Sequence, residues 1–270
     1  DLPSDKTMVR LPVAAVPVAP AAHLHSLHLA PPTAKTLHFV RHAEGTHNVS
    51  PDYKTPAHLD AKLTELGLEQ CRRLARTTRD LKLDVIVASP TTRCLQTALG
   101  SFDGARSGLI PIVAFEEWRE TVNFLCDARR PTTELSASFP SVDFGRLNGC
   151  NSDPIWDRYE KIHGSWTTYQ GKRESDDGPG LEERARAAWS VISEMPESNI
   201  AIVSHSAFFM HIFTPLFKEL EGIVHYEDSE VKQLMTGQKF ENCELRSVAL
   251  VPPPSANIAL SRSAGRSRKY

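Results

Sequence analysis

Polar motifs that directly follow apolar runs contain the residues best suited to chemistry. In LHFVRHAEGTHN the apolar run ends at Arg41 and His42. An arginine guanidinium binds phosphate oxygens through a rigid fork of donors, and its charge discourages protonation of a neighbouring imidazole. The pair therefore predicts a site in which an anion such as phosphate lies beside a nucleophilic histidine.

Two further motifs repeat this arrangement. In DVIVASPTTRCLQTA, Arg93 falls on the first turn of a predicted helix that follows the run DVIVA. In NIAIVSHSAFF, His205 comes almost directly after the run NIAIV. Ligands in open α/β sheets bind beyond the carboxyl ends of the strands. We therefore expect Arg41, His42, Arg93 and His205 to meet at one edge of one sheet.

Such a meeting requires parallel strands with helices on both faces of the sheet. Short apolar runs alternate with helical patterns along the chain, which is typical of a three-layer α/β/α domain with a mostly parallel central sheet. We expect the last strand at an edge of this sheet. The predicted strands are residues 36–40, 84–88, 110–115, 199–204 and 243–251.

Capping residues and helical periodicity locate the helices between these strands. The hydroxyl of Thr64 can cap a helix that begins near it. A second helix is predicted over residues 91–99, and a long one has apolar residues at helical spacing from 181 to 195. The apolar residues expected near one face of the first helix are Leu66, Cys71, Leu74 and Leu81.

Residues 116–180 show few periodic runs and many polar and glycine positions. A long segment of this kind in a compact domain is usually a functional lid or binding loop. Its aromatic residues either form the core of the lid or line the site, where they would favour a bulky organic phosphate: Trp118, Phe124, Trp156 and Trp166. Its charged residues either order the insertion as ion pairs or select the substrate: Asp127, Arg129 and Arg130.

The two ends of the chain differ in composition from the predicted domain, residues 36–252. Residues 1–35 are rich in Ala and Pro, and the prolines break both helices and the apolar core of a signal peptide. We expect an extended arm there. Residues 253–270 contain basic residues and no acidic one, which predicts a flexible tail.

The overall composition limits the classes of function. A formal net charge of −2 gives no broad basic field for binding nucleic acid. No apolar run approaches the roughly 20 residues of a membrane span. Five cysteines without a C-x-x-C pair argue against a disulfide framework and a zinc site. We expect a cytoplasmic protein with a small-molecule partner and neither nucleic acid nor membrane as partner; its oligomeric state stays open, a homodimer included.

Taken together, RHAEGTHN, SPTTRCLQTA and IVSHSAFF resemble the motifs of the histidine phosphatase superfamily, also called phosphoglycerate mutase-like. The resemblance covers most of residues 36–251, and WRETVNFLCDARRPTTEL, FPSVDF and NCELRS look like a branch found in fungi and plants. It implies that His42 becomes phosphohistidine and that Arg41, Arg93 and His205 form the phosphate pocket. It also implies that Asn48 contacts the transferred group.

The resemblance further implies a carboxylic acid that protonates the leaving group. Glu120 fits this role best, and Glu116 and Glu117 are the alternatives. The implied function is a phosphomonoesterase that hydrolyses a small organic phosphate. It would need neither metal nor cofactor, because the two arginines and a protonated His205 can hold the charge of the transferring phosphoryl group.

Two other functions remain open. One is a phosphoglycerate-type mutase, although the chain lacks the longer basic stretch associated with that branch. The other is a catalytically weak protein that binds phosphorylated ligands, because Ala43 and Ala207 stand where the family usually has glycine. Alanine is tolerated at position 43 if its φ stays negative. His38 and His47 are predicted to be structural.

Overall fold

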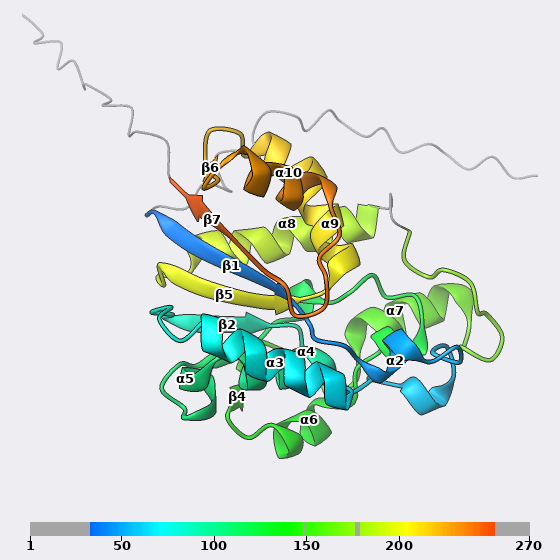
Figure 1. The fold of residues 1–270 in the computed structure, drawn as a ribbon. Helices are drawn as coiled ribbons and strands as arrows, with labels where there is room; N and C mark the ends of the chain where they lie inside the picture. The colour runs from blue at the N-terminus through cyan, green and yellow to red at the C-terminus, as the bar shows by residue number, and fades with distance from the viewer. Residues whose placement is uncertain (1–32, 148, 176–178, 252–270) are drawn as a thin grey trace, which may run out of the picture.

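A computed structural model describes residues 33–147, 149–175 and 179–251. Within these ranges seven strands form one sheet in the order β4-β3-β2-β5-β1-β7-β6 (Figure 1). The strands from β4 to β1 in this order run parallel, whereas β7 is antiparallel to both β1 and β6. The strands are β1 (Lys35–Arg41), β2 (Val85–Ala88), β3 (Ile112–Ala114), β4 (Val142–Asp143), β5 (Asn199–Ser204), β6 (Val224–His225) and β7 (Leu245–Leu250).

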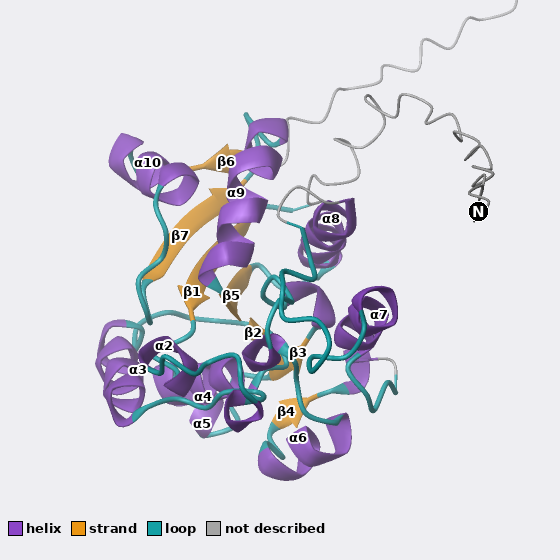
Figure 2. Ribbon diagram, turned by 90° about the vertical axis from the view of Figure 1, so that its right-hand side faces the viewer, coloured by secondary structure: helices purple, strands orange, loops and turns teal. Residues whose placement is uncertain are grey.

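Helices cover both faces of the sheet, which confirms the predicted three-layer fold. In both views α8, α9 and α10 lie on one side of the sheet, and α3, α4 and α6 lie on the other (Figures 1 and 2). The longer helices are α3 (Glu65–Thr77), α4 (Thr92–Ser101), α6 (Thr132–Ser138), α7 (Pro154–His163), α8 (Pro179–Glu194), α9 (Ser206–Glu219) and α10 (Ser229–Gly237). Shorter turns are α2 (Thr46–Val49), η1 (Pro56–His58), α5 (Asp103–Arg106), η2 (Glu116–Trp118), η3 (Leu125–Asp127) and η4 (Gly145–Leu147).

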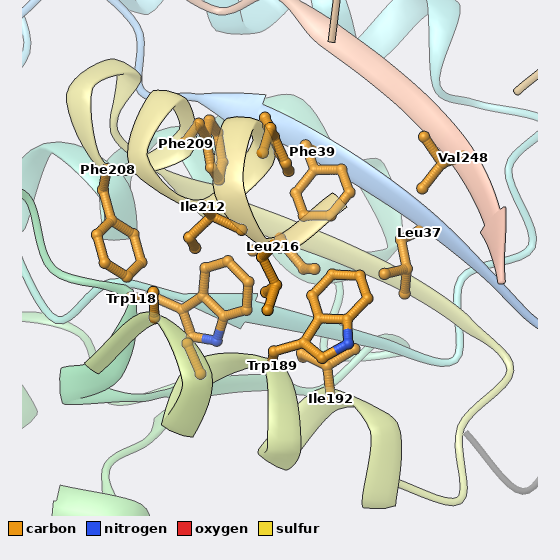
Figure 3. Packing of buried hydrophobic residues seen from close by; sticks show 14 of the residues in the cluster. Leu37, Phe39, Trp118, Trp189, Ile192, Phe208, Phe209, Ile212, Leu216 and Val248 are labelled. Carbon is orange, nitrogen blue, oxygen red and sulfur yellow. The ribbon is translucent and has the colours of Figure 1, made fainter. Parts of the chain in front are cut away.

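Alternating side chains of the central strands fill two cores. Leu37 and Phe39 of β1 pack with residues of α8 and α9, including the fully buried Trp189 (Figure 3). Val40 of the same strand packs into the opposite core with residues of α4 such as Leu95. Because successive strand residues point to opposite faces, the apolar runs of the central strands predict burial on both sides.

Removing the indole of Trp189 is expected to lower the free energy of unfolding by about 3–5 kcal/mol, because a cavity would replace a large buried side chain. Its ring also meets that of Phe217 at a centroid distance of 5.5 Å. Denaturant unfolding of Trp189→Ala measures the loss. Leu109→Ala is the control, since Leu109 is 82% exposed and its removal should change stability by less than about 0.5 kcal/mol. Equal losses in the two variants would contradict this account of the core.

The structure confirms the five predicted strands as β1, β2, β3, β5 and β7. It also confirms the cap of α3, because the Thr64 hydroxyl accepts a hydrogen bond from the Gly67 amide at 3.0 Å. The expectation that the last strand forms an edge is wrong, since β6 pairs outside β7. The proposed face of α3 is also partly wrong: Leu66 is 50% exposed, and Leu81 lies beyond the end of the helix.

Residues 116–180 contain more regular structure than their sequence predicts. They include α6, α7 and the start of α8, and they supply β4 to the main sheet. The strand was missed because only two of its residues pair. Part of this segment therefore belongs to the three-layer domain. The predicted lid stays a prediction for the residues of 116–180 that lie between these elements.

The predicted arm, apart from residues 33–35, and the predicted tail at 253–270 lie outside the described residues. In the part of the chain that is described, no helix combines the length and the apolar character needed to cross a bilayer.

Candidate active site

Three neighbouring parallel strands bring the predicted site residues to one edge of the sheet. Arg41 pairs in register with Ser204, and Ala88 of β2 pairs with Val203 of β5. His42 therefore leaves β1 beside the end of β5, and its amide donates to the Ser204 carbonyl at 2.9 Å. The rings of His42 and His205 lie 5.1 Å apart between centroids. The parallel topology thus accounts for the meeting of these two histidines.

The loop that follows His42 is held by its neighbours. The Ala43 amide donates to the Thr97 hydroxyl of α4 at 3.0 Å, and the Thr64 amide donates to the Glu44 carbonyl at 2.9 Å. Helix α3 approaches so closely that a Cβ atom on Gly67 would lie 2.2 Å from the Glu44 oxygen. Ala43 is absent from the described residues that have positive φ, so alanine fits there without strain.

His42 is 2% exposed and has one defined ring partner. Its Nδ1 lies 2.8 Å from the Ala43 carbonyl, which can only accept, so Nδ1 carries the proton and Nε2 keeps its lone pair. Burial lowers the pKa of His42 well below its ordinary value, and the charges of Arg93 and Arg41 lower it further. The side chain is therefore a neutral imidazole suited to nucleophilic attack through Nε2.

His205 is also neutral, which corrects the expectation of a protonated imidazole. Its Nδ1 lies 3.2 Å from the Arg93 guanidinium, which can only donate, and its Nε2 lies 2.9 Å from the Ser89 hydroxyl. Burial, followed by the charge of Arg93, lowers the pKa of His205 well below its usual value. A cation in contact with Nδ1 thus disfavours the second proton.

Arg93 occupies the first turn of α4, where its guanidinium is almost fully buried. It donates to the Cys126 carbonyl, and it lies 3.4 Å from the carboxylate of Asp127. Its Nε has no hydrogen-bond partner among the described residues. The side chain therefore keeps one N–H donor that no described protein group uses.

Arg41 lies to the side of this group. Its guanidinium donates to the Phe240 carbonyl at 2.8 Å, and its buried Nε has no hydrogen-bond partner within the described part of the chain. Burial lowers the pKa of Arg41, whereas the charge of Glu120 is the largest influence that raises it. Arg41 does not line the pocket described below.

Among the three candidate acids, the geometry favours Glu120. Its Oε1 accepts from the Thr121 amide and from the Phe208 amide in the first turn of α9, both at 2.9 Å. Burial raises the pKa of Glu120 to about 7, and the nearby carboxylate of Asp127 adds to this rise. Glu116 is instead held in ion pairs with two buried arginines, Arg119 at 3.0 Å and Arg129 at 2.6 Å. Glu117 does not line the pocket described below.

A pocket of about 450 Å³ opens at this edge of the sheet. Three of the six predicted site residues line it: Asn48, Arg93 and Glu120. Asn48 is exposed at its rim, and its side-chain oxygen accepts from the Gly45 amide at 2.9 Å. His42 and His205 do not line the pocket but lie directly against residues that do.

Sequence reasoning assigned His47 a structural role, but the structure places it in the pocket lining. Its ring lies 5.5 Å from that of His42, and burial with the charges of Arg93 and Arg41 lowers its pKa to about 2. Its position five residues after His42 in the same motif was the available signal. For Asp127 the sequence left open whether it orders the insertion as an ion pair or selects the substrate. The structure places it in the pocket lining beside Arg93.

The other uncertain residues of the 116–180 segment have structural contacts. Arg129 pairs with Glu116, and Arg130 pairs with the buried Asp60 at 3.1 Å. Trp118 belongs to the main core, whereas Trp156 and the adjacent Trp166 form a separate cluster. Phe124 alone of the four aromatic residues lines the pocket. His38 is buried and bonded to Ser247 and Asn199, as a structural histidine should be.

The sequence of this chain is similar to proteins of one family. The sequence profile of the histidine phosphatase superfamily (branch 1) matches residues 37–122. A phosphoglycerate mutase-like protein of Arabidopsis thaliana is 32% identical over 255 residues, which cover 80% of this chain and 84% of that protein. A probable phosphatase of Schizosaccharomyces pombe is 24% identical and covers 73% of this chain and 93% of its own length.

Among solved structures, a phosphoglycerate mutase from Bacillus anthracis str. Sterne is similar, with a TM-score of 0.49 and 16% identity over 83% of this chain and 90% of that one. The profile match includes most of the strand β1 motif and runs through Arg93. On the strength of that sequence similarity, the chain belongs to the histidine phosphatase superfamily.

Proposed function

We propose that this protein is a phosphomonoesterase that hydrolyses a small organic phosphate through a phosphohistidine on His42. The observation that carries the proposal is the neutral imidazole of His42, whose proton is held at Nδ1 by the Ala43 carbonyl. The free Nε2 lies in a cluster with Arg93 and His205, where an anion can be held. Membership of a family with phosphatase-named relatives supports the same function.

In the first step, Nε2 of His42 attacks phosphorus in line with the ester oxygen. The N–P bond forms as the P–O bond to the leaving group breaks, and protonated Glu120 donates its proton to the departing alkoxide. Arg93 and Arg41 stabilise the charge on the equatorial oxygens, which is the main requirement of phosphoryl transfer. His205 receives a hydrogen bond from Arg93 and so keeps that guanidinium oriented.

In the second step, ionised Glu120 takes a proton from water as the water oxygen attacks phosphorus. The N–P bond breaks, inorganic phosphate leaves, and His42 and Glu120 return to their starting protonation states. The guanidinium groups of Arg93 and Arg41 supply the positive charge in this scheme, so we propose that no metal is needed. The described residues hold no cluster of three or more His, Cys, Asp or Glu side chains suited to a metal ion.

The test follows phosphate release and the covalent intermediate together. Wild-type protein is incubated with an aryl phosphate in the presence of a chelator, and the release of inorganic phosphate is measured. A second sample is quenched in alkali, which preserves phosphohistidine, and its peptides are analysed for phosphorylation. We expect sustained phosphate release and a phosphorylated His42 peptide. A mutase would be indicated by phosphorylated His42 without phosphate release, if the protein also moved the phosphoryl group between positions of a phosphoglycerate when primed with the bisphosphate. If neither phosphohistidine nor phosphate release were found, the protein would be a binding protein.

A further inference from the structure

Two segments that lie far apart in the sequence form an aromatic wall on the candidate pocket. Tyr53 and Phe124 both line it and meet edge to face, with ring centroids 5.4 Å apart. Pro51 and Ala207 add further apolar surface to the lining. Both rings are only partly buried, so a ligand group that packs on them would remove more apolar area from water.

The pocket holds little positive charge for a second anionic group. Arg93 is the one lysine or arginine among the described residues of its lining. Its guanidinium already faces the Asp127 carboxylate at 3.4 Å and would serve the phosphate end of a substrate. Asp127 adds an acidic group to the lining. A carboxylate on the substrate would therefore meet the Asp127 carboxylate without a second cation in the lining to compensate it, which disfavours its binding.

Lys54 lies against the two rings but outside the lining of the pocket. Its Nζ lies 4.7 Å from the ring centroid of Phe124 and 5.6 Å from that of Tyr53. Lys54 lines a separate small pocket that shares Phe124 with the candidate site, and it is absent from the lining of the site itself. A cation at these distances is attracted to the ring faces and helps to keep the two rings together.

We propose that this site selects phosphate monoesters whose alcohol part is uncharged and aromatic, and that Tyr53 and Phe124 bind that part. The inference rests on the proposed function, because it places the phosphate end beside Arg93 and His42. The pocket volume of about 450 Å³ falls within the 300–1,000 Å³ typical of sites for organic ligands. A phosphorylated sugar acid would leave the aromatic wall uncovered.

The test compares three primary alkyl phosphates with similar leaving groups, so that chemistry does not obscure binding. These are 2-phenylethyl phosphate, glycerol 3-phosphate and 3-phosphoglycerate. We expect kcat/KM for 2-phenylethyl phosphate to exceed that for glycerol 3-phosphate by about 10- to 100-fold, mostly through KM. We expect 3-phosphoglycerate to be the poorest of the three.

Variants separate the wall from the rest of the site. Phe124→Ala is expected to lower the ratio of kcat/KM for 2-phenylethyl phosphate to that for glycerol 3-phosphate by about tenfold. Phe124→Leu keeps most of the apolar volume and should lower the ratio less. It separates the loss of the aromatic ring from a misfolded loop. Phe144→Ala is the matched control, because Phe144 is partly buried in a different cluster and should leave the ratio unchanged.

A gain of function tests the charge argument. Pro51 is exposed at the pocket, so Pro51→Lys adds a cation without removing a buried group. We expect it to raise kcat/KM for 3-phosphoglycerate relative to glycerol 3-phosphate by about threefold to tenfold, an effect that declines with added salt.

The outcomes distinguish this inference from the function on which it rests. Turnover of all three esters with no preference for the aromatic one, or a preference for 3-phosphoglycerate, overturns the inference alone. Absence of both turnover and phosphohistidine rejects the proposed function and the inference with it. Both are supported if kcat/KM for the three esters follows the expected order and if Phe124→Ala, but not Phe144→Ala, removes or reverses the preference for 2-phenylethyl phosphate.

Discussion

His42→Ala is expected to lower phosphate release by at least about 10⁴-fold for every monoester tested, because the group that forms the covalent intermediate is removed. Steady-state assays should show kcat and kcat/KM falling together, since the lost interaction belongs to the transition state. Mass spectrometry after an alkaline quench should show no phosphohistidine at this position. The variant should still bind inorganic phosphate, because the guanidinium of Arg93 is retained.

The control for His42→Ala is His38, a histidine of strand β1, which ends directly before His42. His38→Asn removes a buried imidazole that bonds to Ser247 and Asn199, outside the candidate pocket. It should lower thermal stability and retain most of the turnover. If His42→Ala kept more than a few per cent of wild-type activity at equal folding, His42 would not be the nucleophile.

Glu120→Gln is expected to cost about 10²–10⁴-fold in kcat/KM for alkyl phosphates, whose alkoxide leaving groups need a proton. The loss for p-nitrophenyl phosphate should be less than about tenfold, because nitrophenolate leaves without one. A burst of nitrophenolate equal to the enzyme concentration should then appear, since Glu120 also activates the water of the second step. Stopped-flow absorbance measures the burst, and parallel assays give the two values of kcat/KM.

The pH profile follows from the raised pKa of Glu120, which is about 7. The acid must be protonated to donate, so kcat/KM for alkyl phosphates should fall above pH 7 by about tenfold per pH unit. His42 must be neutral to attack, and its pKa lies well below 6.5, so no matching loss is expected just below neutrality. Glu120→Gln should abolish the alkaline decline.

Glu117→Gln is the matched control for this acid, because Glu117 is a partly buried neighbour that does not line the pocket. It should change kcat/KM less than about twofold and keep the alkaline decline. An equal loss in Glu117→Gln, or an unaltered profile in Glu120→Gln, would assign the proton donor elsewhere.

Local sequence signals were sufficient for the framework of the fold. The central strands are buried on both faces, so their consecutive residues are apolar and can be recognised in the sequence as short apolar runs. The side chain of Thr64 caps α3 through a contact only three residues away. Strands β4 and β6 were missed because each pairs through two residues, which leaves no period to detect.

The sequence by itself determined that His42, Arg93 and His205 would meet, because parallel strands deliver the residues at their carboxyl ends to one edge. Only the tertiary structure decided the protonation of both imidazoles, since it depends on Ala43, Arg93 and burial. It also placed Glu120, His47, Asp127 and the Tyr53–Phe124 wall at the pocket and raised the pKa of Glu120. Contacts between segments 70 or more residues apart, such as Tyr53 with Phe124 and Glu120 with Phe208, leave no trace in local pattern, because packing rather than spacing creates them.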